Sequence, residues 1–209
     1  MTAGLGNPLL GTTTHPLPKK VGVVGAGTIG PDIAYYLKSA IAGLELVLVD
    51  VDEAPLRAAT ERIEAYAAKG VARGKLTQPE ADGVAAKLHT TLDYEDLAGS
   101  DWVIEAATEN LNLKREIFER IESIVAPTAL LTSNTSSLPA ARIFGGLSHT
   151  ARCTVTHFFA PAFRNPVVEV VDWEGAAPDT VEHLRRLFTA TGKVPLVTAD
   201  AVCFMLDRV

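Results

Sequence analysis

The chain has 209 residues, of which 47% are hydrophobic, and this length and apolar content suffice for one large domain with a buried core. A formal net charge of −6 excludes a strongly basic protein of the kind that binds nucleic acid, although local basic clusters are compatible with it, so we expect a small-molecule ligand. No segment reaches membrane-spanning length, the first residues lack a signal-peptide pattern, and Cys153 and Cys203 lie in apolar surroundings typical of buried structural thiols, so we expect a cytoplasmic protein without membrane association.

The first part of the chain alternates between short apolar runs and segments whose apolar residues recur at helical spacing. Residues 1–18, rich in Gly, Thr and Pro, predict a flexible arm ahead of the folded part. After this arm the patterns predict strands over residues 20–24, 44–49, 102–106 and 129–132, and helices over residues 28–42 and 53–75, from Pro79, after residue 110 and near Ser136.

The same alternation continues to the end of the chain. We predict strands over residues 153–159, 167–171 and 193–198 and a helix over residues 179–191. Because right-handed crossovers carry each helix back across the sheet, this order predicts an α/β fold with a Rossmann-type, doubly wound, mostly parallel sheet and helices on both faces. We assign this domain to residues 19–200 and expect its ligand at the carboxyl edge of the strands.

A glycine motif directly follows the first predicted strand and opens the first predicted helix. In this context Gly25 permits a tight turn, Gly27 lets the backbone approach a pyrophosphate, and Gly30 lets the helix pack closely on the strand. The loop residues between them, Thr28 and Ile29, are then also expected to contact the cofactor. The motif therefore predicts a bound dinucleotide.

Asp50 ends the second predicted strand, twenty positions after Gly30. A carboxylate at this place accepts hydrogen bonds from the adenosine ribose hydroxyls and disfavours a 2′-phosphate. No arginine immediately follows Asp50 to neutralise such a phosphate. We therefore expect NAD as the cofactor and assign no metal site.

Basic residues gather at the end of the long second helix, where Lys69 and Arg73 lie. Two interpretations stay open for them: a solvated helix end, or a patch that binds a phosphate of the ligand.

His157 and Glu169 lie on two successive predicted strands. A histidine whose second nitrogen bonds a carboxylate has a fixed tautomer and holds a proton more readily. Oxidation of an alcohol needs such a base to take the hydroxyl proton while hydride leaves for the nicotinamide. An isolated histidine on a strand is more often structural, so this pair alone does not decide the function.

Several uncommon motifs together resemble the 3-hydroxyacyl-CoA dehydrogenase family. They are GAGTIG at residues 25–30, IEAATEN at 104–110, SNTSSL at 133–138, HFF at 157–159 and VEV at 168–170. The resemblance runs from about Val21 to the end of the chain.

The resemblance implies roles for residues at the matching positions. It makes His157 the catalytic acid/base, Glu169 its orienting partner, and Ser136 a catalytic hydroxyl that binds the substrate oxygen and positions the nicotinamide. Ala107, Glu109 and Lys114 become cofactor-binding candidates. The alternatives are a helix N-terminus that favours the negative Glu109, a solvated Lys114, and a helix-capping role for the hydroxyl and amide cluster at residues 134–137.

The chain departs from the family pattern at residues expected near the substrate. Ala160 stands where the family has an asparagine, which removes one amide contact. Asp207 also replaces an asparagine, and an ionised carboxylate cannot donate a hydrogen bond to a thioester oxygen. Arg164 lies in a segment that the family fills with mainly apolar residues; it is either a bidentate clamp for a substrate carboxylate or an exposed surface arginine.

The resemblance implies an NAD-dependent dehydrogenase that interconverts a 3-hydroxyacyl-CoA and its 3-oxo form, as in fatty acid β-oxidation. A dehydrogenase of a free hydroxy acid and a non-catalytic NAD-binding module remain as alternatives. Family members continue into a helical domain that closes over the substrate and forms a homodimer. Residues 201–209 are then expected to begin such a domain, most of which lies beyond this chain.

Overall fold

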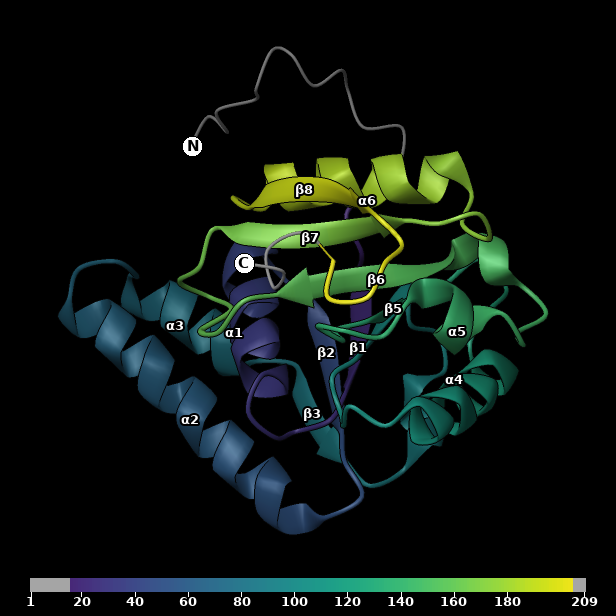
Figure 1. The fold of residues 1–209 in the computed structure, drawn as a ribbon. Helices are drawn as coiled ribbons and strands as arrows, with labels where there is room; N and C mark the ends of the chain where they lie inside the picture. The colour runs from purple at the N-terminus through teal and green to yellow at the C-terminus, as the bar shows by residue number, and fades with distance from the viewer. Residues whose placement is uncertain (1–15, 205–209) are drawn as a thin grey trace.

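The computed structural model describes residues 16–204 and contains one eight-stranded sheet flanked by helices (Figure 1). The strands are β1 (Lys20–Val24), β2 (Glu45–Val49), β3 (Leu88–Thr91), β4 (Trp102–Glu105), β5 (Leu130–Ser133), β6 (Cys153–Phe158), β7 (Val167–Asp172) and β8 (Val194–Ala199). The helices are α1 (Gly30–Ala40), α2 (Glu53–Ala72), α3 (Gln78–Ala85), α4 (Leu111–Ile124), α5 (Ala140–Phe144) and α6 (Pro178–Ala190), with 3₁₀ turns at Tyr94–Leu97 and Thr150–Arg152.

The strand order is β3-β2-β1-β4-β5-β6-β7-β8. Every neighbouring pair is parallel except β6 and β7, which run antiparallel. The chain winds outward from β1 to β3, then returns to the other side of β1 with β4. The sheet is therefore doubly wound and mostly parallel, as predicted, and its direction of winding reverses between β1 and β4.

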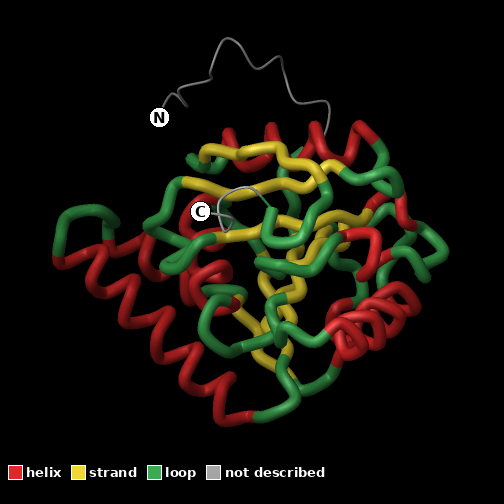
Figure 2. Tube along the Cα trace, in the orientation of Figure 1, coloured by secondary structure: helices red, strands yellow, loops and turns green. Residues whose placement is uncertain are grey.

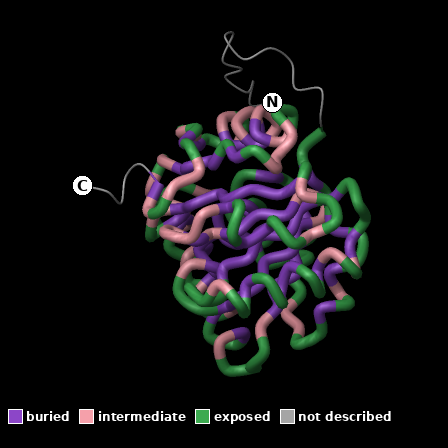
Figure 3. The backbone as a smooth tube through the Cα atoms, turned by 45° about the vertical axis from the view of Figure 1, so that its right-hand side comes forward, coloured by how far each residue is buried: buried purple, intermediate pink, exposed green. Residues whose placement is uncertain are grey.

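Helices cover both faces of the sheet, and Figure 2 shows them on either side of the strands. One buried apolar cluster joins α1, α2, α3 and α6 to the sheet through residues such as Ile33, Ile63 and Leu184. A second joins α4 and α5 to the opposite face through Phe118 and Phe144. The central strands are consequently buried on both sides, as their nearly unbroken apolar sequences require (Figure 3).

One strand was missed by the sequence patterns, and one helix begins later than they indicated. β3 is a four-residue edge strand, LHTT, whose polar residues carry no apolar run. The helix expected near Ser136 begins instead at Ala140, where the Asp200 carboxylate accepts hydrogen bonds from the N–H groups of Ala140 (2.6 Å) and Ala141 (3.0 Å). The other predicted elements are present with ends displaced by at most three residues.

Both cysteines are free, but their surroundings differ. Cys153 is fully buried, and burial raises the pKa of its thiol to about 12. Cys203 is only half-buried, so the expectation that both thiols are buried is wrong for this residue, which lies in a turn after β8. Within residues 16–204, every helix falls short of the length and apolar content needed to cross a bilayer.

Candidate active site

The glycine motif forms the turn between β1 and α1, at the point where the winding of the sheet reverses. Gly25 has a φ of 109° and its N–H donates to the Val49 carbonyl (2.8 Å); a Cβ here would lie 2.6 Å from the Ala106 carbonyl oxygen. A Cβ on Gly30 would lie 1.9 Å from the Gly25 carbonyl oxygen. Both glycines are therefore required by the fold.

Gly27 differs from these two, because a Cβ placed there would meet no described atom within 4 Å. Packing within residues 16–204 thus gives no reason for a glycine, and the residue is exposed. The open space above the loop lies at the N-terminus of α1, where free N–H groups favour a phosphate. The loop therefore fits the pyrophosphate of a dinucleotide.

Asp50 lies at the end of β2 and connects it to the glycine loop. One carboxylate oxygen accepts the N–H of Ala26 (2.7 Å), and the other accepts those of Val51 (2.7 Å) and Asp52 (3.3 Å). An ionised carboxylate has about four acceptor positions, so hydrogen-bonding capacity remains for ribose hydroxyls. Asp50 thus also shapes the loop, which its position in the sequence did not indicate.

Lys114 is buried, so the alternative of a solvated lysine is wrong. Its side chain is 2% exposed, and its ammonium group contacts both oxygens of the fully buried Glu105, at 2.7 and 2.9 Å. Ser133 (2.6 Å) and the Ala107 N–H (2.8 Å) also donate to Glu105. This buried ion pair joins α4 to the ends of β4 and β5, and the sequence patterns did not single out Glu105.

Glu109 contacts the loop after β5. Its Oε1 accepts hydrogen bonds from Thr135 Oγ1 (2.6 Å), the Ser136 N–H (2.9 Å) and Ser137 Oγ (3.1 Å), while Lys114 Nζ lies 3.5 Å from Oε2. Burial alone would raise the pKa of Glu109, but these donors and the Lys114 charge outweigh it and hold the pKa below its usual value. Glu109 is thus an ionised support for the Ser136 loop, while Asn110 caps α4.

The hydroxyl and amide cluster at residues 134–137 does not cap a helix. Asn134 accepts the N–H of Phe158 (2.9 Å), and Thr135 Oγ1 accepts that of Leu138 (3.0 Å). The cluster therefore holds the loop against β6, which leaves Ser136 beside the end of that strand.

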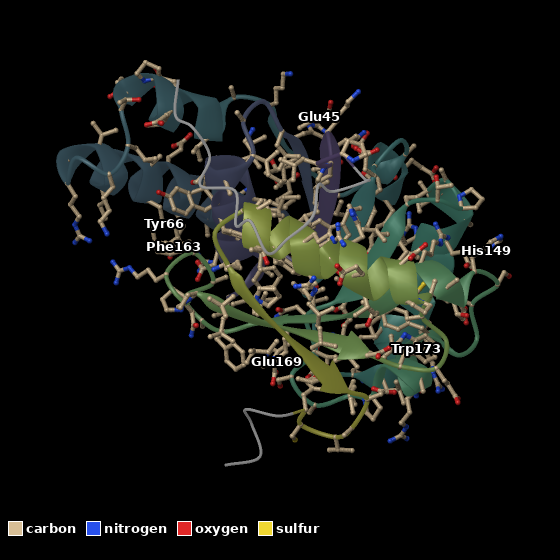
Figure 4. The ribbon with its side chains drawn as sticks, turned by 90° about the horizontal axis from the view of Figure 1, so that it is seen from above. Glu45, Tyr66, His149, Phe163, Glu169 and Trp173 are labelled. Atoms are coloured by element: carbon tan, nitrogen blue, oxygen red, sulfur yellow. The ribbon has the colours of Figure 1, made fainter. Side chains whose placement is uncertain are left out.

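His157 and Glu169 face each other across the antiparallel pair β6 and β7. His157 Nδ1 lies 2.8 Å from Glu169 Oε2, and both side chains are buried. The ring of Phe159 lies beside the imidazole, with 4.3 Å between the centroids. Glu169, which is labelled in Figure 4, lies on β7.

A cavity of about 350 Å³ brings several of the predicted residues together. It lies at the carboxyl ends of β4, β5 and β6, which is the edge expected for ligands. Its lining includes Ile29, Ala107, Glu109, Lys114, Asn134, Ser136, His157 and Ala160.

Other predicted residues lie elsewhere. Lys69 and Arg73 are exposed near the end of α2, and Arg164 is exposed with its guanidinium 5.6 Å from the Phe163 ring centroid. None of the three lines the 350 Å³ cavity. Asp207 and most of residues 1–18 and 201–209 lie outside the described residues.

A doubly wound sheet whose first strand ends in this glycine loop defines a dinucleotide-binding domain. Comparison with known families then gives the particular one. The family described as "3-hydroxyacyl-CoA dehydrogenase, NAD binding domain" matches residues 20–201, so this chain belongs to that family. The resemblance seen in the sequence is confirmed, NAD is the cofactor, and the protein is of the NAD-dependent oxidoreductase class.

Solved structures show the same similarity. The (S)-3-hydroxybutyryl-CoA dehydrogenase of Ralstonia eutropha is 30% identical with a TM-score of 0.87, over 92% of this chain and 67% of that one. The 3-hydroxybutyryl-CoA dehydrogenase of Escherichia coli is 34% identical with a TM-score of 0.85, over 89% of this chain and 39% of that one. A 5-formyl-3-hydroxy-2-methylpyridine 4-carboxylic acid 5-dehydrogenase is 28% identical with a TM-score of 0.81, over 91% of this chain and 60% of that one. The chain thus spans about two thirds of the first protein and less of the other two.

Proposed function

We propose that this protein oxidises a 3-hydroxyacyl-CoA to the 3-oxoacyl-CoA, or catalyses the reverse reaction, with His157 as the acid/base. The observation that carries the proposal is that His157, whose Nδ1 lies 2.8 Å from the buried Glu169, lines a cavity together with Ser136 and Glu109. Similarity to the 3-hydroxybutyryl-CoA dehydrogenases supports the thioester as substrate.

The histidine is oriented for proton transfer. Because Nδ1 is engaged by Glu169, Nε2 is the nitrogen left to accept the hydroxyl proton of the substrate. Bound NAD would supply the acceptor for the hydride that leaves the carbon bearing this hydroxyl. The buried carboxylate of Glu169 stabilises the imidazolium formed by this proton transfer. In the reverse direction the imidazolium returns the proton to the alkoxide oxygen.

Ser136 is the second group proposed to contact the substrate. Its N–H is held by Glu109 at 2.9 Å, whereas its Oγ lies at the longer distance of 3.3 Å from the same oxygen. The hydroxyl is therefore weakly engaged and can donate to the substrate oxygen. Glu109 fixes the backbone of Ser136 while leaving this hydroxyl available.

A basic surface outside the cavity fits the phosphates of the CoA group. Tyr66 and Lys69 lie on α2, and Arg73 is its C-cap residue, so the three follow one another at helical spacing. Tyr66 packs against Phe163 with 4.5 Å between ring centroids (Figure 4). Arg164, next to Phe163, adds a further positive charge near Tyr66. Phosphates are bound by such lysine and arginine groups.

A free hydroxy acid is the second candidate substrate. Ala160 lines the cavity at the position where the family has an asparagine, so one polar contact to the acyl group is absent. The similar 5-dehydrogenase acts, by its name, on a pyridine carboxylic acid, which is not a thioester. In this alternative Arg164 would bind the substrate carboxylate.

The two candidates are separated by measuring NADH absorbance with NAD and a matched pair of substrates, (S)-3-hydroxybutyryl-CoA and free 3-hydroxybutyrate. The proposal expects NADH from the thioester and not from the acid. It also expects the double variant Lys69→Ala, Arg73→Ala to raise KM for the CoA substrate but not for its pantetheine analogue. NADH from the free acid alone would replace the proposal by the second candidate, and NAD binding without NADH from any hydroxy substrate would indicate a binding module.

A further inference from the structure

Arg62 lies on α2, and its side chain contacts the glycine loop between β1 and α1. Its Nη2 donates to the carbonyl oxygens of Thr28 (2.7 Å) and Gly27 (3.2 Å). The same nitrogen lies 3.6 Å from the carboxylate of Asp32, which is buried in the first turn of α1. One guanidinium thus joins the loop, α1 and α2.

These two carbonyls belong to the peptide units that carry the N–H groups of Thr28 and Ile29. In a planar trans peptide the C=O and the following N–H point in opposite directions. An arginine that holds both carbonyls on one side therefore directs both N–H groups to the other side. Within residues 16–204 neither N–H donates a backbone hydrogen bond, so both remain available to a ligand.

We propose that Arg62 is a positioning residue for the NAD pyrophosphate, which it serves by fixing the two loop peptides whose N–H groups bind the phosphates. A Cβ at Gly27 would meet no described atom within 4 Å, so there is open space beside this part of the loop. Arg62 acts through the backbone and need not contact the cofactor itself.

A second residue of α2 holds the arginine's carboxylate partner in place. Tyr66, one turn after Arg62, donates from its hydroxyl to Asp32 Oδ1 (3.1 Å). The Asp32 carboxylate is therefore contacted by two groups from α2, the neutral Tyr66 hydroxyl and the charged Arg62 guanidinium. This arrangement fixes Asp32 beside the guanidinium, and with it the direction from which Arg62 reaches the loop.

The test is the affinity of the chain for NAD, ADP-ribose and adenosine, measured by calorimetry for the wild type and for Arg62→Met. We expect Kd to rise about tenfold for NAD and for ADP-ribose, which corresponds to about 1.4 kcal/mol. Adenosine lacks the pyrophosphate, so its Kd should not change. The melting temperature should stay within about 4 °C of the wild type.

Arg185→Met serves as the matched control, because Arg185 is partly exposed on α6 and pairs with Glu182 (2.7 Å). It should leave all three affinities unchanged. Arg62→Lys keeps a charged donor and should raise Kd for NAD by less than Arg62→Met; it also provides the test if the methionine variant does not fold. Wild-type NAD affinity in Arg62→Met, or an equal loss for adenosine, would overturn the proposal.

Discussion

Removal of the Lys114 ammonium group should destabilise the whole domain. In Lys114→Met, the Glu105 carboxylate stays fully buried but loses the only charged group described within hydrogen-bond distance, at 2.7 and 2.9 Å. Breaking a buried ion pair from one side costs about 3–5 kcal/mol, because the remaining charge is uncompensated.

The structure places the expected loss at the lower end of this range. Ser133 (2.6 Å) and the Ala107 N–H (2.8 Å) still donate to Glu105 in the variant, and hydrogen bonds to a charged group recover part of its lost hydration. We therefore expect the free energy of unfolding to fall by about 3 kcal/mol.

Urea titration followed by tryptophan fluorescence measures this loss, since both Trp102 and Trp173 are buried. The double variant Lys114→Met, Glu105→Gln should recover part of the stability, because it removes both charges. Lys69→Met, which changes an exposed lysine, should stay within about 0.5 kcal/mol of the wild type. A loss below about 1 kcal/mol in Lys114→Met would refute the assignment of Lys114 as a buried structural cation.

Three further predictions follow from single contacts. Gly27→Ala should keep wild-type stability but bind NAD more weakly, because a Cβ there meets no described atom. In Gly30→Ala the Cβ would lie 1.9 Å from the Gly25 oxygen, so the free energy of unfolding should fall by about 1–3 kcal/mol in the same urea titration. Equal stability of the two variants would contradict this. Burial lowers the pKa of Lys193 to about 8 from its usual 10.5, so the unfolded chain binds more protons between these values; the free energy of unfolding should therefore rise from pH 7.5 to 9.5, and rise less in Lys193→Met. Asp200→Ala should cost about 1 kcal/mol in thermal unfolding, because α5 loses its two N-terminal hydrogen bonds, and an unchanged melting temperature would argue against this capping role.

The regular elements were predictable because their apolar residues follow the period of the structure. β1, β2 and β4 are buried on both faces and read as apolar runs, and α1 and α4 show helical spacing. β3 was missed because an edge strand needs no such run. The start of α5 was misplaced because its N-terminus is capped by Asp200, which lies 60 positions after Ala140.

The site residues were predictable where they lie close together in the sequence or on consecutive elements. The glycine loop is local, and His157 and Glu169 lie on consecutive strands, so their pairing needed only the antiparallel register. The ion pair of Lys114 with Glu105 could not be anticipated, because it depends on how deeply α4 packs against the ends of β4 and β5. The contact of Arg62 with the glycine loop depends in the same way on the packing of α2.

The proton-transfer role of His157 is the central claim, and it is tested most directly by kcat/KM for (S)-3-hydroxybutyryl-CoA in His157→Gln, with Kd for NAD measured on the same preparation. Glutamine keeps a polar side chain of similar length but cannot accept the hydroxyl proton as a base. We predict that kcat/KM falls by about 10²–10⁴-fold while Kd for NAD stays unchanged. A variant that retains kcat/KM within about tenfold of the wild type would contradict His157 as the acid/base.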